Sequence, residues 1–212
     1  MDLQAMRREY LQGGLRRRDM ASNPHEQFAE WMRQAIEMDI IDPTAMVLAT
    51  AMPDGDISQR IVLLKGFDAE GFVFYSNYDS RKGRAMAANP RVSLHFPWHA
   101  LERQVIVAGQ VDRIPAARSA EYFHSRPRES QLAAIASEQS QPVADRDTLE
   151  QAFVRLQQEY ADREIPVPED WGGYIVRPER MEFWQGGRYR LHDRFEYQLQ
   201  ATGGWALQRL SP

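Results

Sequence analysis

The sequence predicts a mainly β protein with flanking helices, and it favours a β-barrel over an open sheet. From residue 45 onward, apolar and polar residues alternate with a period of two, and turn-forming groups interrupt the alternation at 53–56 and 68–71. Roughly seven or eight such strand segments fit into the chain, a number of short strands that is typical of a barrel. Apolar residues at helical spacing are confined to a few segments between the strands.

The helix that opens the domain is predicted from its capping residues. Asn23 is a suitable N-cap, Pro24 fits the first helical position, and Glu26 stands three residues after the cap. Phe28 and Trp31 begin an aromatic stripe at helical spacing, so an amphipathic helix is expected to run to about residue 42 with this stripe in the core. The other expected strands are 45–52, 58–65 and 72–76, which form a three-stranded antiparallel meander, followed by 91–96, 103–114, 181–185, 188–197 and 205–210. The other expected helices are 81–88, 116–124, 128–136 and 146–162.

Composition limits the classes of function. The chain has 212 residues, of which 43% are hydrophobic and 26% charged, as in an ordinary globular domain. No apolar run approaches the ~20 residues of a membrane span, and the first residues lack the apolar core of a signal peptide, so a cytoplasmic protein without a membrane partner is expected. The absence of cysteine and the scattered histidines argue against thiol chemistry and a metal site. A net charge of -4 provides no general attraction to nucleic acid, so any anion site must be local.

The segment 181–194 carries more polar chemistry than a plain strand needs. Gly186 and Gly187 predict the turn of a β-hairpin, because paired glycines readily adopt positive φ angles. Alternation along the second strand would place Arg190, His192 and Arg194 on one face. Cations held side by side repel each other, so an anionic or electron-rich ligand is expected between them. The alternative is a solvated strand face.

Two further segments are candidate phosphate sites. Ser80, Arg81 and Lys82 stand at the start of a predicted helix, where free N–H groups and the helix dipole favour an anion. Pro127 predicts a break between two helices, and the new N-terminus with Arg126 would form a second site. Tyr122 and Ser130 complete that second group. The alternative for the first segment is ordinary helix capping by Ser80, with Arg81 and Lys82 in solvent.

Two phosphate sites in a small barrel predict two phosphorylated ligands, a cofactor and a substrate. Arg60 and Lys65 stand five residues apart at the ends of one strand, and strict alternation puts them on opposite faces. Either a bulge near Gly66 reorients Lys65, or the two cations serve different parts of one ligand. Neither a GxGxxG nor a GxxxxGK[ST] motif is present, so a mononucleotide such as a flavin phosphate is favoured, with Trp184 and Gln104 available for its ring system.

Ten segments, in order along nearly the whole chain, resemble the pyridoxine/pyridoxamine 5'-phosphate oxidase family. The last of them is the family signature. They are RREY at 7–10, GGLRRRD at 13–19, DPTAM at 42–46, QRIVLLK at 59–65, FYSN at 74–77, SRK at 80–82, NPRVSL at 89–94, FPWHALERQV at 96–105, YFHSRPRES at 122–130 and EFWQGGRYRLHDR at 182–194.

The resemblance implies an FMN-binding split β-barrel and a homodimer with FMN bound non-covalently at the interface. It implies oxidation of pyridoxamine 5'-phosphate and pyridoxine 5'-phosphate by molecular oxygen to pyridoxal 5'-phosphate and hydrogen peroxide, with ammonia released from the amine. Hydride would pass from the substrate C4' to flavin N5. Two rivals remain: an enzyme of the same barrel superfamily that reduces another substrate, and a non-catalytic flavin-binding or pyridoxal-phosphate-binding protein.

The resemblance also assigns residues. Residues 1–20 would be a flexible arm that closes over the site, and residues 21–212 a single domain. The FMN-contacting positions would be Arg60, Ile61, Lys65, Tyr75, Ser76, Arg81, Lys82, Gln104, Gln139, Ser140, Trp184 and Arg194. The substrate-contacting positions would be Arg7, Tyr10, Lys65, Tyr122, Arg126, Ser130, Arg190 and His192, with Arg190 and His192 orienting the reacting end of the substrate.

Overall fold

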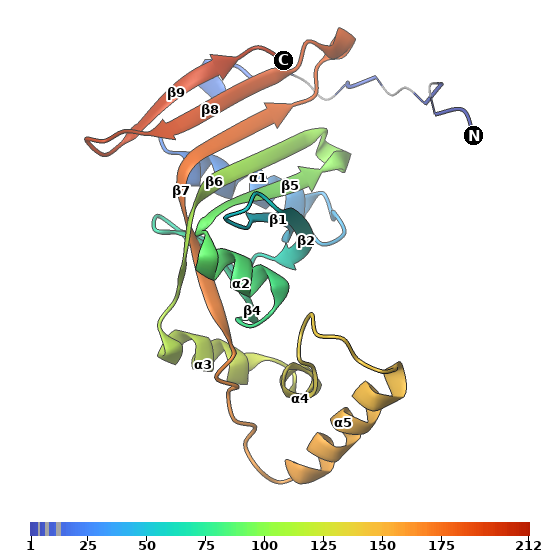
Figure 1. Ribbon diagram of the computed structural model, residues 1–212. Coiled ribbons are helices and arrows are strands. Elements are labelled where there is room, and N and C mark those ends of the chain that lie inside the picture. The colour runs from blue at the N-terminus through green and yellow to red at the C-terminus, as the bar shows by residue number, and fades with distance from the viewer. Residues whose placement is uncertain (4, 7–8, 12–13) are drawn as a thin grey trace.

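The fold is an antiparallel sheet that curls into a half-barrel, with helices on its flanks (Figure 1). A computed structural model describes residues 1–3, 5–6, 9–11 and 14–212. Neighbouring strands follow the order β2-β1-β5-β6-β7-β4-β3, and β8 and β9 extend from β7. This confirms the prediction of a mainly β protein with flanking helices. The strands are β1 Ala45–Ala51, β2 Ile57–Leu63, β3 Gly66–Asp68, β4 Gly71–Asn77, β5 Arg91–Trp98, β6 Arg103–Arg113, β7 Trp171–Gln185, β8 Asp193–Leu199 and β9 Trp205–Leu210.

Helix α1, Pro24–Glu37, fills the curl of the sheet. The Asn23 side chain caps it by accepting the N–H of His25, as the sequence predicts, although the helix ends before residue 42. Phe28 is fully buried, and its ring lies 4.9 Å from the rings of both Phe72 and Phe96 in edge-to-face contact. Such contacts between aromatic rings stabilise beyond the area they bury. The aromatic stripe of α1 is therefore core, as expected.

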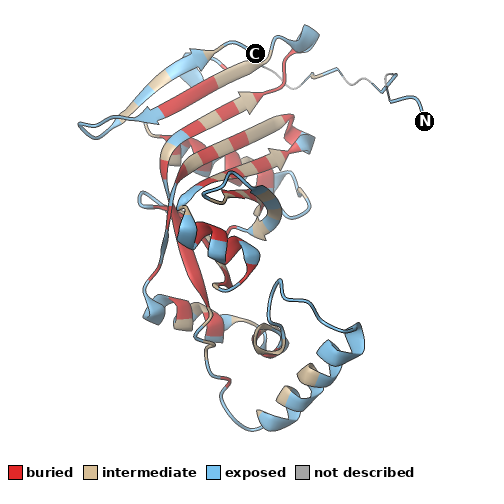
Figure 2. Ribbon diagram, viewed as in Figure 1, coloured by how far each residue is buried: buried red, intermediate tan, exposed pale blue. Residues whose placement is uncertain are grey.

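The remaining helices gather mainly at one end of the molecule. Helices α3 and α4 separate at Pro127, which confirms the predicted break. With α5 they pack around Phe123, Leu132, Ile165 and Trp171. Most of α5 faces solvent (Figure 2). None of the helices in the described ranges is long and apolar enough to cross a membrane. The bounds are α2 Arg81–Ala88, α3 Ala116–Ser125, α4 Arg128–Ala136 and α5 Arg146–Glu159, with short 3-10 turns at Arg17–Asp19, His99–Leu101 and Arg188–Arg190.

The predicted three-stranded meander is wrong. Strand β1 pairs with β2, but β4 pairs with β3 and β7. The chain leaves β2 after Leu63, buries Leu64, and resumes pairing where the Lys65 N–H donates to the Val73 carbonyl. Alternation alone does not identify the strand that becomes the neighbour. Strand β7 also begins at Trp171, well before the expected 181. The early part was not predicted because its first six residues are all buried and show no period of two.

The hairpin between β7 and β8 exists, but its predicted turn is wrong. Gln185 pairs with Asp193, and residues 186–192 form the connection. Tyr189 and Arg190 have φ angles of 56° and 65°, whereas Gly187 is extended. Arg190 and His192 therefore lie in a loop and not on a strand face with Arg194. The glycines instead permit close approach, since a Cβ atom at Gly186 would lie 2.5 Å from the Tyr10 ring.

Candidate functional site

A cavity of about 1010 Å³ opens between β2, β4, the start of α2 and the α3–α4 break. Cavities of several hundred cubic ångströms or more are typical of sites for cofactors and small ligands. Its lining is rich in cations and hydroxyls. Twelve predicted site residues line it: Arg60, Ile61, Lys65, Tyr75, Ser76, Arg81, Lys82, Tyr122, Arg126, Ser130, Gln139 and Ser140.

The first anion cradle lies at the start of α2. Ser80 is the N-cap, and its Oγ accepts the N–H of Gly83 at 3.2 Å. Lys82 is 9% exposed, and its Nζ donates to Ser80 Oγ and to Gln139 Oε1, both of which are neutral. Burial, followed by repulsion from Arg60, lowers the pKa of Lys82 to about 8. An ammonium held by neutral groups at a helix N-terminus is suited to a bound phosphate. Of the alternative based on ordinary helix capping, the Ser80 cap and an exposed Arg81 are present, but Lys82 is buried and not in solvent.

Arg60 and Lys65 reach the same cavity. Arg60 Nη1 donates to the Leu48 carbonyl at 3.0 Å and to Thr50 Oγ1 at 2.9 Å, which fixes the guanidinium. Burial, followed by the charge of Arg81, lowers the pKa of Arg60. Lys65 lies between the end of β2 and the start of β3, so the alternation of one continuous strand does not apply to it. Arg81 also lines the cavity and forms an exposed ion pair with Asp56 at 2.8 Å.

The second anion cradle lies at the α3–α4 break. Arg126 and Tyr122 line the cavity from the end of α3, and Ser130 lines it from the first turn of α4. The Nη1 atom of Arg126 is buried and has no hydrogen-bond partner among the described residues. Tyr122 stacks on Tyr75 with 3.8 Å between ring centroids. Tyr75 lies on β4 and Tyr122 on α3, so this contact links the β4 wall of the cavity to the α3 wall.

Sequence reasoning missed Trp171 in this cavity. The residue is 8% exposed, lines the cavity, and stacks in parallel with Tyr75 at 5.5 Å. The guanidinium carbon of Arg126 lies 4.9 Å from its ring centroid. The only available signal in the sequence was a tryptophan directly before the glycine pair Gly172 and Gly173. A glycine pair in a strand region does not by itself indicate a binding site.

The other predicted residues gather at the opposite end of β7. Tyr10 contacts Trp184 and His192 edge-on, with ring centroids 5.6 Å and 5.3 Å apart. The Gly187 N–H donates to Nδ1 of His192 at 3.1 Å, so the proton of the neutral ring is on Nε2. Burial, followed by the charge of Arg190, lowers the pKa of His192 and favours this neutral form. His192 thus keeps an N–H donor on its other nitrogen.

Gln104, Trp184 and Arg194 occupy one row across β6, β7 and β8. Directly paired residues point to the same face, so these three side chains share the face opposite buried Val105, Phe183 and Phe195. Arg194 is held by both oxygens of Glu182, at 2.8 Å and 3.1 Å, and this hydrogen bonding raises its pKa. Trp184 and Arg194 therefore lie side by side, whereas Arg190 stands apart on the loop and is exposed.

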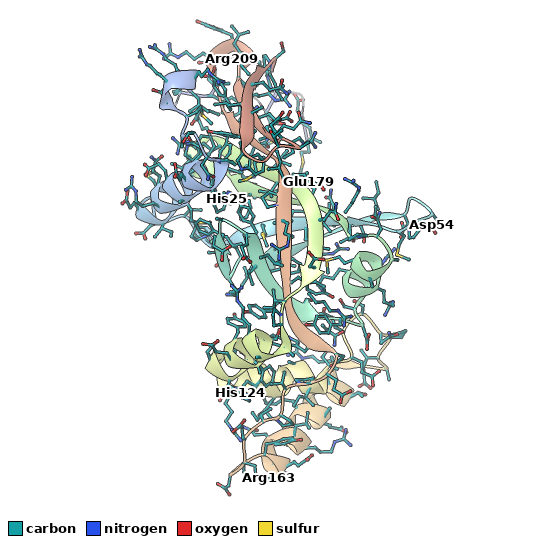
Figure 3. The ribbon with its side chains drawn as sticks, turned by 90° about the vertical axis from the view of Figure 1, so that its left-hand side faces the viewer. His25, Asp54, His124, Arg163, Glu179 and Arg209 are labelled. Atoms are coloured by element: carbon teal, nitrogen blue, oxygen red, sulfur yellow. The ribbon has the colours of Figure 1, made fainter. Side chains whose placement is uncertain are left out.

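Within one chain, the residues that line the cavity lie far from the residues around Trp184 and the β7–β8 loop. Thirteen steps of β7 separate Trp171 from Trp184, and at about 3.3 Å per residue these span on the order of 40 Å of strand. Figure 1 shows the β7–β8 loop at one end and α3 to α5 at the other. Figure 3 marks the same ends with Arg209 on β9 and Arg163 just beyond α5. Arg7 lies outside the described residues.

The comparisons with known proteins agree on one family. Residues 30–160 match the family model described as pyridoxamine 5'-phosphate oxidase, and residues 171–212 match the one described as pyridoxine 5'-phosphate oxidase C-terminal dimerisation region. A pyridoxine/pyridoxamine 5'-phosphate oxidase of Vibrio cholerae is 53% identical over 212 residues, which are 100% of both chains. One of Teredinibacter turnerae is also 53% identical over the full length of both. The chain belongs to this family.

As a pyridoxine/pyridoxamine 5'-phosphate oxidase family member, the chain is a flavin-dependent oxidoreductase of vitamin B6 metabolism with the dimerisation region of a homodimer. PhzG from Burkholderia lata, solved with tetrahydrophenazine-1-carboxylic acid, is 28% identical with a TM-score of 0.87, over 92% of this chain and 95% of that one. An FMN-binding protein of Nostoc punctiforme has a TM-score of 0.72 at 13% identity, over 91% and 100%. These likenesses confirm the split-barrel fold.

Proposed function

We propose that the protein uses FMN and molecular oxygen to oxidise pyridoxamine 5'-phosphate and pyridoxine 5'-phosphate to pyridoxal 5'-phosphate, with hydrogen peroxide as the second product and ammonia released from the amine. The observation that carries the proposal is one cavity with two separate cationic cradles, at Lys82 and at Arg126, joined by stacked Tyr75 and Tyr122. Two phosphate groups, one on each ligand, fit this arrangement. We place the enzyme in the cytoplasm, as expected from the sequence.

The cavity residues suit FMN. The neutral partners of Lys82 and the fixed guanidinium of Arg60 leave positive charge available for a phosphate. Ser76 and Gln139, which hydrogen-bond to each other at 3.3 Å, would provide further polar contacts. When bound, the flavin would supply the chemistry that accepts hydride from the substrate C4' and reacts with oxygen. The role of the chain is to bind, orient and shield.

We propose that the site is completed across the dimer. Trp184, Arg190, His192 and Arg194 lie too far along β7 to reach the cavity of their own chain, so the partner's copies would face it. Strand β2 supports this placement: Ile61 lines the cavity yet is 70% exposed, and Ile57 beside it is 68% exposed. Exposed apolar side chains in a row favour a covering partner. FMN would then lie at the interface.

We propose that Arg190 and His192 orient the reacting end of the substrate. The Nε2–H of His192 offers a hydrogen bond to an acceptor on the pyridine ring, and Arg190 supplies positive charge beside it. Lys65, Tyr122, Arg126 and Ser130 would hold the substrate phosphate at the other end. Anchoring both ends fixes C4' relative to the flavin, and no strong general base is required.

One assay separates this function from its rivals. Bound FMN should be reduced by pyridoxamine 5'-phosphate without oxygen and reoxidised in air with release of hydrogen peroxide. A non-catalytic binding protein would show no reduction. An enzyme for a different substrate, such as a tricyclic carboxylate like the PhzG ligand, would reduce the flavin only with that compound. Lys65 and Arg126 both line the cavity, and their charges favour a phosphorylated substrate.

The pH dependence of FMN affinity tests the Lys82 cradle. The ammonium binds phosphate, so affinity should be full below the pKa of about 8 and should fall as pH rises through it, by up to about tenfold per unit. Fluorescence quenching of FMN would measure this, and riboflavin, which lacks the phosphate, should show no such fall. A fall of equal size with riboflavin would contradict the assignment. Without ligand, the same lowered pKa should make stability rise between about pH 8 and the ordinary 10.5.

We propose that the arm, residues 1–20, closes over the site through two carboxylates. The Leu11 N–H donates to Glu102, which is 4% exposed, and the Leu15 N–H donates to Asp193, both at 2.8 Å. The Glu102 carbonyl also accepts the Gly186 N–H at 2.8 Å, so the arm and the β7–β8 loop share one anchor. Tyr10 is thereby held against His192.

Glu102→Gln should loosen the arm, because a neutral acceptor holds a backbone N–H less strongly than a carboxylate. Hydrogen exchange in a peptide covering residues 9–15 should become faster, and KM should rise about threefold, since charge-assisted hydrogen bonds are roughly twice as strong as neutral ones. Glu150→Gln, in an exposed pair with Arg146, serves as the control and should change neither measurement. Unchanged exchange in Glu102→Gln would show that this carboxylate does not anchor the arm.

A further inference from the structure

Among the described residues, no carboxylate forms an ion pair with the half-buried guanidinium of Arg126. Its buried Nη1 has no hydrogen-bond partner among the described residues, and the charge faces the cavity. An unpaired cation is costly to desolvate unless other groups stabilise it. The side chain therefore needs something besides a carboxylate to hold it, because a carboxylate would compete with a phosphate ligand.

Trp171 provides this support. The Arg126 guanidinium carbon lies 4.9 Å from the centroid of the Trp171 ring, within the range of a cation–π interaction. Trp171 also lies parallel to Tyr75 and Tyr122, with interplanar angles of 12° and 5°. One indole ring thus contacts or stacks with three residues of the cavity, from both the cofactor side and the substrate side.

The surroundings hold Trp171 itself in place. Its backbone pairs with Asn77 of β4, and its ring meets the fully buried Phe123 at 5.1 Å. The backbone of Arg126 is fixed separately, because the Gln131 amide donates to its carbonyl at 2.8 Å. The main chain at Arg126 is therefore held by Gln131, and the Arg126 guanidinium carbon lies nearest the Trp171 ring, at 4.9 Å, with the Phe123 ring at 5.7 Å.

We infer that Trp171 is a positioning residue that holds Arg126 ready for the substrate phosphate and thereby sets the selectivity for phosphorylated over unphosphorylated ligands. The inference rests on the proposed function of the Arg126 cradle. An aromatic face stabilises a cation without neutralising it, so the full charge stays available to a phosphate. The Trp171 ring acts through Arg126 and is not proposed to touch the reacting atoms.

Trp171→Leu in the FMN-loaded enzyme tests this. KM for pyridoxine 5'-phosphate should rise about threefold to tenfold, the effect of losing a partly desolvated cation–π contact, while kcat stays within about twofold. The affinity ratio of pyridoxal 5'-phosphate to pyridoxal, measured by fluorescence titration, should fall by a similar factor. Trp171→Phe keeps an aromatic face and should recover most of both losses. If Trp171→Leu does not fold, Trp171→His replaces it with the same expected direction.

Two comparisons make the outcome decisive. Trp205 is a half-buried tryptophan on β9 that is not among the residues lining the cavity, and Trp205→Leu should leave KM and the affinity ratio unchanged. Arg126→Ala should raise KM about tenfold to a hundredfold through loss of a charge-assisted bond. If Arg126→Ala raises KM and Trp171→Leu does not, the positioning role is wrong and the proposed function stands. If Arg126→Ala leaves KM unchanged, the phosphate assignment fails, and the inference fails with it.

Discussion

Coexpression of equal amounts of Arg126→Ala and His192→Ala subunits is expected to restore about a quarter of the wild-type kcat/KM, although each variant alone is severely impaired. The reason is the length of β7: within one folded subunit, Arg126 lies near the start of this strand and His192 just beyond its end. If each site combines the cavity of one subunit with the β7–β8 loop of the other, a mixed dimer contains one site with both defects and one with neither. Random pairing makes about half of the dimers mixed, so about a quarter of all sites are intact.

A matched control uses two variants from the same end of β7. Lys82 and Arg126 both line the cavity, so coexpression of Lys82→Met with Arg126→Ala leaves every site with one defect and should restore nothing. Tagged subunits purified through both tags would give pure mixed dimers, in which about half of the activity is expected. Mixed dimers of Arg126→Ala with His192→Ala that remain inactive would contradict a site shared between subunits.

Local signals in the sequence were sufficient to predict where helices α1, α2 and α4 begin. Asn23 before Pro24 predicts the start of α1, and Pro127 predicts the α3–α4 break, because capping and the missing proline N–H act within a few residues. Ser80 likewise predicts the N-terminus of α2. The residues of both cradles followed from these boundaries. Helix starts that depend on residues within one turn could be predicted from that turn.

The strand order and the β7–β8 loop could not be predicted in this way. Pairing of β4 with β7 joins segments about a hundred residues apart, and nothing in either segment alone specifies the partner. Buried Ile175 and Val176 belong to the first six residues of β7, which show no alternation and are overlooked by a search for a period of two. The turn was predicted at the glycines because positive φ angles are uncommon for residues such as tyrosine and arginine. In the structure, however, Tyr189 and Arg190 adopt those angles. Trp171 was missed because its role depends on these long-range contacts.

His192→Ala and Arg190→Ala are each expected to lower kcat on the order of a hundredfold while FMN remains bound, because misplacing the reacting carbon by about 1 Å has an effect of that size. Both residues lie on the loop after β7, away from the cavity that would hold the cofactor phosphate. Stopped-flow reduction of the bound flavin would measure the step directly, and the absorbance of the purified protein would report its FMN content. Loss of FMN from either variant would instead make these residues cofactor ligands.

Two conservative replacements of His192 distinguish the contribution of its Nδ1 from that of its Nε2. Nδ1 accepts the Gly187 N–H, so the proposed contact to substrate belongs to Nε2–H. Asparagine can offer an oxygen near the Nδ1 position but no donor at Nε2, whereas glutamine can extend an N–H donor to about that point. Flavin reduction should therefore be faster in His192→Gln than in His192→Asn. The reverse order would mean that His192 acts by holding the loop through Gly187. Because burial and Arg190 lower the pKa of His192, the wild-type rate should decline only when pH falls below the ordinary range of histidine, as the ring becomes protonated and releases Gly187.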